Sequence, residues 1–350
     1  MRSKLYLENV PMRRVRVVRI SLCASLLIQI LAAQAPTSDV KLDVAERQLV
    51  LNAVIADVKQ YYFDRNIALN TADALLAHER AGDYNQVTDG QAFANLLARH
   101  LIDASRDVHF TMEYTRNVFP DFSKPPPPED LARYRTAMEQ VNCTFEKVEI
   151  RPDNVGYVKL NSFPDIGACQ SNAESAMRDL NHADALVFDL RDNRGGDGNM
   201  VVFLASYLFD HPEYMFSPRG PLTERAWTRS PVAGSMLVNK PVYILTSART
   251  YSAAEQFSYD LKVLKRATII GETTGGASHA GVLHNLDDHF AIGIPELRPV
   301  NPFSDKDWAV TGIEPDVKVK AADAPTAAQK LADKKIQAIK DARVPANSRK

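Results

Sequence analysis

The chain has 350 residues, of which 45% are hydrophobic and 24% charged, a composition that argues against a disordered, collagenous or coiled-coil protein. The formal net charge is −1, but the first 33 residues are strongly basic, and the remainder holds 36 Lys/Arg against 42 Asp/Glu. A mildly acidic body without a basic stripe argues against nucleic acid as a partner.

The first 35 residues have the pattern of an export signal. A basic stretch at residues 12–19 precedes an apolar run of 14 residues at 20–33, and small residues follow at Ala32, Ala33 and Ala35. The run is shorter than the roughly 20 residues of a membrane span. We therefore expect a periplasmic or extracellular protein with no stable membrane span after signal removal. An uncleaved anchor is the alternative.

Export would leave Cys143 and Cys169 in an oxidising compartment. A disulfide between them is possible, but the sequence does not determine their separation in space.

Residues 36–123 predict a small helical N-terminal domain, since apolar residues recur there at helical spacing between 40 and 104. Residues 109–114 alternate polar and apolar side chains, which is typical of a half-buried strand. The run KPPPPE at 124–129 predicts a stiff proline-rich linker over residues 124–140.

Beyond the linker, strand and helix patterns alternate through residues 141–322. Strands are predicted at 155–160, 185–190, 241–245 and 268–271, with helices at 173–180, 200–209 and 253–264. This order favours an α/β core with a mostly parallel sheet. Residues 323–350 predict a C-terminal amphipathic helix and a tail.

Two strand ends carry candidate chemistry. At the first, residues 189–199 (DLRDNRGGDGN) lead from a buried strand through a glycine-rich turn, where backbone N–H groups can converge on an anion. A purely structural turn is the alternative. No phosphate-loop motif is present in the sequence.

At the second, a helix is predicted to start at about Ser252, where a hydroxyl meets the positive end of the helix dipole. The pair Ser252 and Glu255 also fits a capping box, which is a purely structural device. A serine nucleophile needs a base, and His109 is the first candidate, because it opens a predicted strand. His279, in a loop of small residues, is the second. The spacing of His279, His284 and His289 matches no metal site, and the sequence has no HExxH motif.

Together these segments resemble the S41 peptidase family. The matching motifs are NVGYV at 154–158, DLRDNRGG at 189–196, TYSAAE at 250–255, GETTGG at 271–276 and GIEPD at 312–316. The resemblance implies a core of the ClpP/crotonase-like α/β type. Processing proteases of the family carry a lysine 25 residues after the serine, where this chain has Ala277. They also carry a PDZ domain, for which the 46 residues between His109 and Gly156 are too few. The resemblance is therefore to the branch of the tricorn core and interphotoreceptor retinoid-binding protein.

The resemblance also implies roles for individual residues. Ser252 is the expected nucleophile and His109 the expected base. The N–H of Gly195 or Gly196, with that of Ala253, would form the oxyanion hole. Relatives often place a glutamate where this chain has Ala309, and three acids are candidates to orient the histidine instead: Asp107, Asp307 and Glu314.

The sequence thus predicts an exported serine peptidase that acts on peptides or unfolded protein and needs no cofactor or metal. The alternatives are a non-catalytic module of the same fold that binds a hydrophobic ligand, and a scaffold that has lost catalysis. The oligomeric state stays open.

Overall fold

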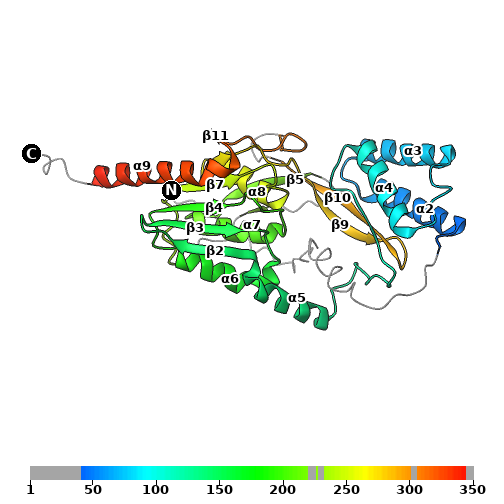
Figure 1. Ribbon diagram of the computed structural model, residues 1–350, viewed down its shortest axis with the longest axis horizontal. Coiled ribbons are helices and arrows are strands. Elements are labelled where there is room, and N and C mark those ends of the chain that lie inside the picture. The colour runs from blue at the N-terminus through cyan, green and yellow to red at the C-terminus, as the bar shows by residue number, and fades with distance from the viewer. Residues whose placement is uncertain (1–40, 220–225, 228–231, 301–305, 344–350) are drawn as a thin grey trace, which may run out of the picture.

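The computed structural model describes residues 41–219, 226–227, 232–300 and 306–343. Figure 1 shows the first helices of the described chain at one end of the molecule and a layered α/β body at the other, with a long antiparallel ribbon between them. The predicted export signal at residues 1–35 lies outside the described residues. None of the described helices has both the length and the apolar character to cross a membrane.

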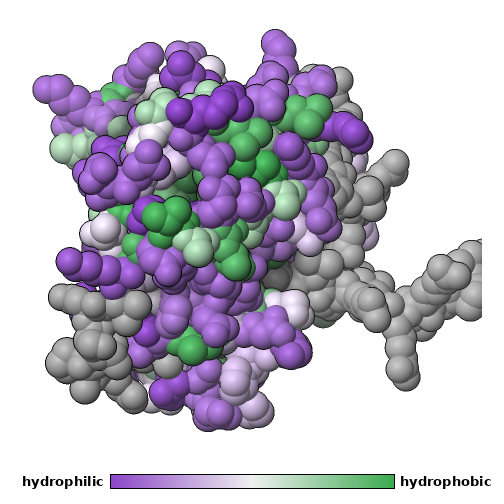
Figure 2. All heavy atoms as spheres, turned by 90° about the vertical axis from the view of Figure 1, so that its right-hand side faces the viewer, coloured by the Kyte–Doolittle hydropathy of each residue, from purple (hydrophilic) through white to green (hydrophobic). Residues whose placement is uncertain are grey.

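The helical end consists of α2 (Val44–Tyr61), α3 (Arg65–Ala81) and α4 (Gly90–Ser105). Each helix starts after an aspartate whose carboxylate accepts hydrogen bonds from N–H groups of the first turn: Asp43, Asp64 and Asp89. Such caps satisfy donors that a helix start leaves without partners. The outer surface of this end is mainly hydrophilic with smaller apolar areas (Figure 2).

An antiparallel sheet that the sequence analysis did not predict packs against these helices. Its strands are β1 (Thr111–Tyr114), β10 (Phe290–Val300), β5 (Tyr214–Arg219) and β6 (Ala226–Trp227) in that order, with β9 (Ala280–Asn285) paired to β10. Phe290, Ile292 and Ile294 of β10 are fully buried in the core of the helical end. The N-terminal unit is therefore not made of residues 36–123 alone, because late strands complete its core.

The α/β body is built on a six-stranded sheet in the order β11 (Val317–Lys318), β8 (Thr268–Gly271), β7 (Val242–Thr246), β4 (Ala185–Asp189), β3 (Val155–Leu160) and β2 (Phe145–Ile150). All neighbours pair in parallel except β2 with β3. The predicted α/β class with a mostly parallel sheet is confirmed.

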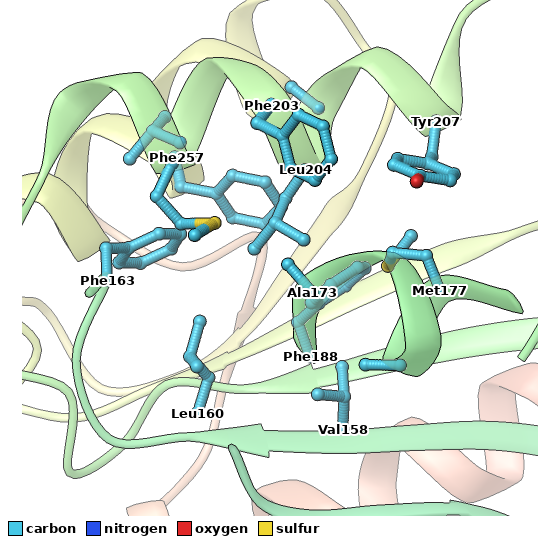
Figure 3. Close-up of a cluster of buried hydrophobic side chains, with 14 of the residues drawn as sticks. Val158, Leu160, Phe163, Ala173, Met177, Phe188, Phe203, Leu204, Tyr207 and Phe257 are labelled. Atoms are coloured by element: carbon cyan, nitrogen blue, oxygen red, sulfur yellow. The ribbon is translucent and has the colours of Figure 1, made fainter. Parts of the chain in front are cut away.

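Helices cover both faces of this sheet, as the buried strands require. One face packs on α6 (Ile166–Asp179), α7 (Gly198–Ala205) and α8 (Ala253–Val263), and the other on α9 (Ala324–Arg343). Figure 3 shows the first face, where Phe188 of β4 and Phe257 of α8 have ring centroids 5.2 Å apart. Because successive side chains of a strand point to opposite faces, β4 supplies both cores.

The predicted linker at 124–140 differs from the structure. Residues 128–140 form the helix α5 (Pro128–Gln140), which buries Tyr134 and Met138 in the core of the α/β body. Proline is compatible with a helix start, where its missing N–H is not needed. Cys143, which follows this helix in the chain, forms a disulfide with Cys169 of α6, and their Cα atoms are 5.7 Å apart.

Candidate active site

Ser252 lies on a strained turn between a strand and a helix. It follows β7, precedes the first residue of α8 and has φ 52° and ψ −121°, which is unusual for a residue with a side chain. Such a conformation costs on the order of 1–3 kcal/mol and needs support from its surroundings. A serine on a strained strand-to-helix turn is also how nucleophile elbows expose their hydroxyl.

The support comes from Glu255 and from the neighbouring strand end. The Ser252 N–H donates to the Glu255 carboxylate over 2.9 Å, as in a capping box. The Tyr251 N–H donates to the Asn193 carbonyl at 3.0 Å, and the Thr250 hydroxyl donates to the Leu190 carbonyl at 2.8 Å. The two strand ends that were predicted to carry chemistry are therefore joined by hydrogen bonds.

The glycine turn after β4 lies directly against Ser252. Gly195 has φ 103°, and a Cβ placed on it would lie 2.7 Å from the Ser252 Cβ and 3.0 Å from the Ala253 nitrogen. A Cβ on Gly196, at φ 139°, would lie 1.9 Å from the Phe163 carbonyl oxygen. Only glycine fits at these two positions.

Backbone donors in this turn are not equivalent. The Gly195 N–H donates to the Asn193 side-chain oxygen at 2.9 Å. Within the described ranges, neither the Gly196 N–H nor the Ala253 N–H donates a hydrogen bond. Of the three predicted donors, these two are therefore available to an anion beside Ser252.

His109 lies in the helical end of the molecule, in the segment between α4 and β1. Its Nδ1 lies 2.9 Å from the Asp107 Oδ1, and the same carboxylate oxygen accepts the His109 backbone N–H at 3.0 Å. The His109 Nε2 is buried and has no hydrogen-bonding partner among the described residues. The ring centroid lies 6.2 Å from that of Tyr251, the neighbour of Ser252. The fold thus places the ring of the predicted base near the serine turn. Its Nδ1 is hydrogen-bonded to Asp107, and its Nε2 has no partner among the described residues.

The Asp107 carboxylate has further hydrogen-bonding partners besides His109. Its Oδ2 lies 2.6 Å from the Nδ1 of His279 and accepts a hydrogen bond from the Tyr62 hydroxyl at 3.0 Å. Burial raises the pKa of Asp107, but the hydrogen bonds and charges of His109 and His279 outweigh burial and hold the pKa below its ordinary value. Burial, followed by the Asp107 charge, raises the pKa of Tyr62, so that its hydroxyl keeps its proton.

Glu255 joins the serine turn to the loop that brings His279. Its carboxylate accepts hydrogen bonds from the N–H groups of Gly276 and Ala277, both at 2.7 Å, and from the Thr274 hydroxyl at 2.5 Å. Burial raises the pKa of Glu255 although these donors lower it. Ala277, where processing proteases have lysine, is buried in this loop.

The other two acids considered for orienting His109 lie elsewhere. Asp307 forms an ion pair with Arg298 and accepts the Ala309 N–H at 2.9 Å. Glu314 is exposed, 3.8 Å from Lys318. Of the three candidate acids, only Asp107 is hydrogen-bonded to His109 within the described part of the chain.

Sequence reasoning missed two partners of this site. It ranked His279 as a competing base, whereas the structure joins it to the same carboxylate as His109. It had no signal for Tyr62, which sits at the end of a helix where an aromatic residue is an ordinary core side chain.

Comparisons with known proteins find relatives of the α/β body. The model of peptidase family S41 matches residues 154–319. Among curated relatives, the chloroplastic carboxyl-terminal-processing peptidase 2 of Arabidopsis thaliana is 29% identical over 197 residues, which are 53% of this chain and 36% of that protein. The chain therefore spans well under half the length of this relative. Residues 154–319 are therefore similar to peptidase family S41.

Solved structures show the same fold over most of the chain. A lipoprotein from Streptococcus agalactiae covers 86% of this chain and 98% of its own, with a TM-score of 0.56 and 15% identity. The tricorn protease covers 84% of this chain and 37% of its own, with a TM-score of 0.53 and 12% identity. At these identities the likeness concerns the fold alone.

Proposed function

We propose that this chain is an exported serine peptidase with Ser252 as nucleophile and His109 as general base. The observation that carries the proposal is a buried His109 Nε2 without a hydrogen-bonding partner among the described residues, in a ring whose centroid lies 6.2 Å from that of Tyr251, the neighbour of Ser252. The strained serine turn has two unused backbone donors among the described residues. The curated relative described above is named as a processing peptidase, which supports the same chemistry.

The mechanism follows from the positions of these groups. The Ser252 hydroxyl oxygen attacks the scissile carbonyl carbon while its proton passes to the His109 Nε2. The oxygen of the tetrahedral intermediate takes the negative charge and accepts the N–H groups of Gly196 and Ala253. His109 then gives its proton to the leaving amine, and an acyl-enzyme remains on Ser252. Water, deprotonated by His109, hydrolyses this ester and restores the serine.

Asp107 would act through His109. A carboxylate at the Nδ1 holds the ring proton there, so that the Nε2 presents a lone pair to the serine. It also stabilises the positive ring that forms during transfer. This assigns the orienting role to Asp107 rather than to Asp307 or Glu314.

The substrate and location follow from the family and the sequence pattern. We expect a peptide or an unfolded protein segment, bound in extended form, in the periplasm or outside the cell. The disulfide between Cys143 and Cys169 fits an oxidising compartment. A hydrophobic-ligand module gains no support from the curated relatives.

A fluorophosphonate probe tests the proposal, since it reacts with activated serines, and mass spectrometry locates the label. We expect labelling at Ser252, its loss in Ser252→Ala, and a decrease of about 10²-fold or more in His109→Ala. Two exposed residues provide matched controls, Ser171→Ala and His182→Ala, which should label normally. Folded protein without label, or labelling that is independent of His109, would contradict the proposal.

A further inference from the structure

Asp107 holds two imidazole rings that come from distant parts of the chain. His109 Nδ1 lies 2.9 Å from one carboxylate oxygen, and His279 Nδ1 lies 2.6 Å from the other. One ligand-type atom from each of the three residues can be chosen so that all lie within 4.8 Å of one another. The three side chains are largely buried, with 2%, 12% and 11% of the Asp107, His109 and His279 side chains exposed.

We propose that Asp107, His109 and His279 form a binding site for one divalent transition-metal ion, best matched by zinc. Two imidazole nitrogens and one carboxylate oxygen are a ligand set that zinc accepts, whereas magnesium and calcium prefer oxygen ligands alone. The ion would replace the protons that now lie between each ring and the carboxylate. A water molecule would take the remaining position.

Metal binding requires a rearrangement of the three side chains. Zinc at roughly 2.0–2.2 Å from each ligand in a tetrahedral arrangement separates neighbouring ligand atoms by about 3.3 Å. The Nδ1–oxygen distances of 2.9 Å for His109 and 2.6 Å for His279 are shorter than this by about 0.4 and 0.7 Å, and they involve different oxygens of Asp107. To bind the ion through one carboxylate oxygen, the Asp107 carboxylate and both rings must therefore rotate.

Tyr62 is not a proposed metal ligand but forms a hydrogen bond with one of the proposed ligands, Asp107. Its hydroxyl donates to the Asp107 Oδ2 at 3.0 Å, and its ring stacks 5.1 Å from Phe110. Hydrogen bonds of this kind orient a ligating carboxylate and raise metal affinity.

Metal binding and catalysis would exclude each other at this site, a consequence that rests on the proposed function. A neutral imidazole has one ring proton and one nitrogen lone pair. When a metal takes the lone pair of the His109 Nδ1, the ring proton must sit on the Nε2. The Nε2 then donates a hydrogen bond and no longer accepts the proton of Ser252.

A second cluster serves as a control. His78, Asp83 and His100 also offer ligand atoms within 4.8 Å, but the two rings stack in parallel with centroids 3.6 Å apart and planes 10° apart. A metal must lie close to the plane of each imidazole that binds it, which two stacked parallel rings do not allow without reorientation.

Calorimetric titration with zinc chloride at neutral pH tests the site. The Ser252→Ala protein is the reference, because the result then does not depend on catalysis. We expect one zinc per chain, loss of that binding in His279→Gln, and 10–100-fold weaker binding in Tyr62→Phe. The control variant His100→Gln should bind as the reference does.

The outcomes separate the site from its alternatives. Absence of binding at micromolar zinc, or equal binding with and without His279, would overturn the proposal. Binding lost only in His100→Gln would place the metal at the second cluster and also overturn it. If His279→Gln fails to fold by circular dichroism, the Tyr62→Phe result decides.

A second measurement separates this inference from the proposed function. In the parent protein, zinc should suppress fluorophosphonate labelling of Ser252, and a chelator should restore it. Zinc binding in a protein that never labels would support the metal site and contradict the peptidase. Labelling that persists with zinc bound would overturn the exclusion between metal and base.

Discussion

Substitution of Gly195 by alanine is the sharpest test of the geometry around Ser252. The added Cβ would lie 2.7 Å from the Ser252 Cβ, 2.9 Å from the Tyr251 carbonyl oxygen and 3.0 Å from the Ala253 nitrogen. None of these atoms is the end of a flexible side chain, so the clash is relieved only by movement of the serine turn itself.

The size of the effect follows from those distances. Carbon atoms pack at roughly 3.5–4.0 Å, so the Ser252 Cβ must retreat by about 1 Å. A displacement of that size at a reacting group costs about 10²-fold in rate. The added Cβ also lies 3.0 Å from the nitrogen of Ala253, one of the two proposed oxyanion donors, and loss of one such donor costs about 10²–10³-fold by itself. We therefore expect labelling of Ser252 at least about 10²-fold slower in Gly195→Ala.

The backbone conformation adds a separate cost. Gly195 has φ 103°, and alanine there is strained by on the order of 1–3 kcal/mol of folding free energy. Gly234 is the matched control, because it has φ 79° and nothing lies within 4 Å of a Cβ built on it. Gly234→Ala should lose stability through strain but label as the parent protein does.

Urea unfolding and labelling rates of both variants decide the matter. If folded Gly195→Ala protein labels as fast as Gly234→Ala protein, the close approach of this turn to the nucleophile has no catalytic meaning, and the reasoning fails.

Three further predictions follow. Glu255→Gln would turn one carboxylate oxygen, which now accepts two donors, into an N–H₂ group. We expect about 2–3 kcal/mol lower stability in urea and slower labelling, whereas an unchanged unfolding midpoint would contradict this role of Glu255. Because the folded-state pKa of Asp107 lies below its ordinary value of 3.8, ionised Asp107 stabilises the fold above about pH 4, and this contribution is lost as the pH falls through the lowered pKa. The stability deficit of Asp107→Asn should therefore be about 2–3 kcal/mol at pH 7 and shrink below pH 4 in urea titrations at each pH, and a deficit that does not change with pH would refute the linkage. The disulfide closes a segment with a sequence separation of 26 residues, so Cys143→Ser combined with Cys169→Ser should cost about 3.5 kcal/mol by chain entropy. Reductant should destabilise the parent protein but not the double variant, and equal sensitivity of both would disprove the bridge.

Local patterns in the sequence determined much of the α/β body. The strands at 155–160 and 268–271 have the bounds that the patterns predicted, because apolar runs and caps depend on neighbouring residues. The helix after Ser252 begins at the predicted residue and ends one residue earlier than predicted. The same locality explains the error at 128–140, where prolines suggested a linker but occupy a helix start.

The contacts that assemble the site depended on the tertiary structure. Asp107 and His279 are 172 positions apart, and Asp107 and Tyr62 are 45 apart, so no local pattern relates them. The strand β10, which completes the core of the helical end, comes from the other half of the chain for the same reason. The sequence pointed to glycines 195 and 196 equally, and only the folded turn, where Asn193 takes the Gly195 N–H, leaves the Gly196 N–H for an anion. Residue types and local spacing thus determined which groups can do the chemistry, whereas long-range packing decided which of them meet.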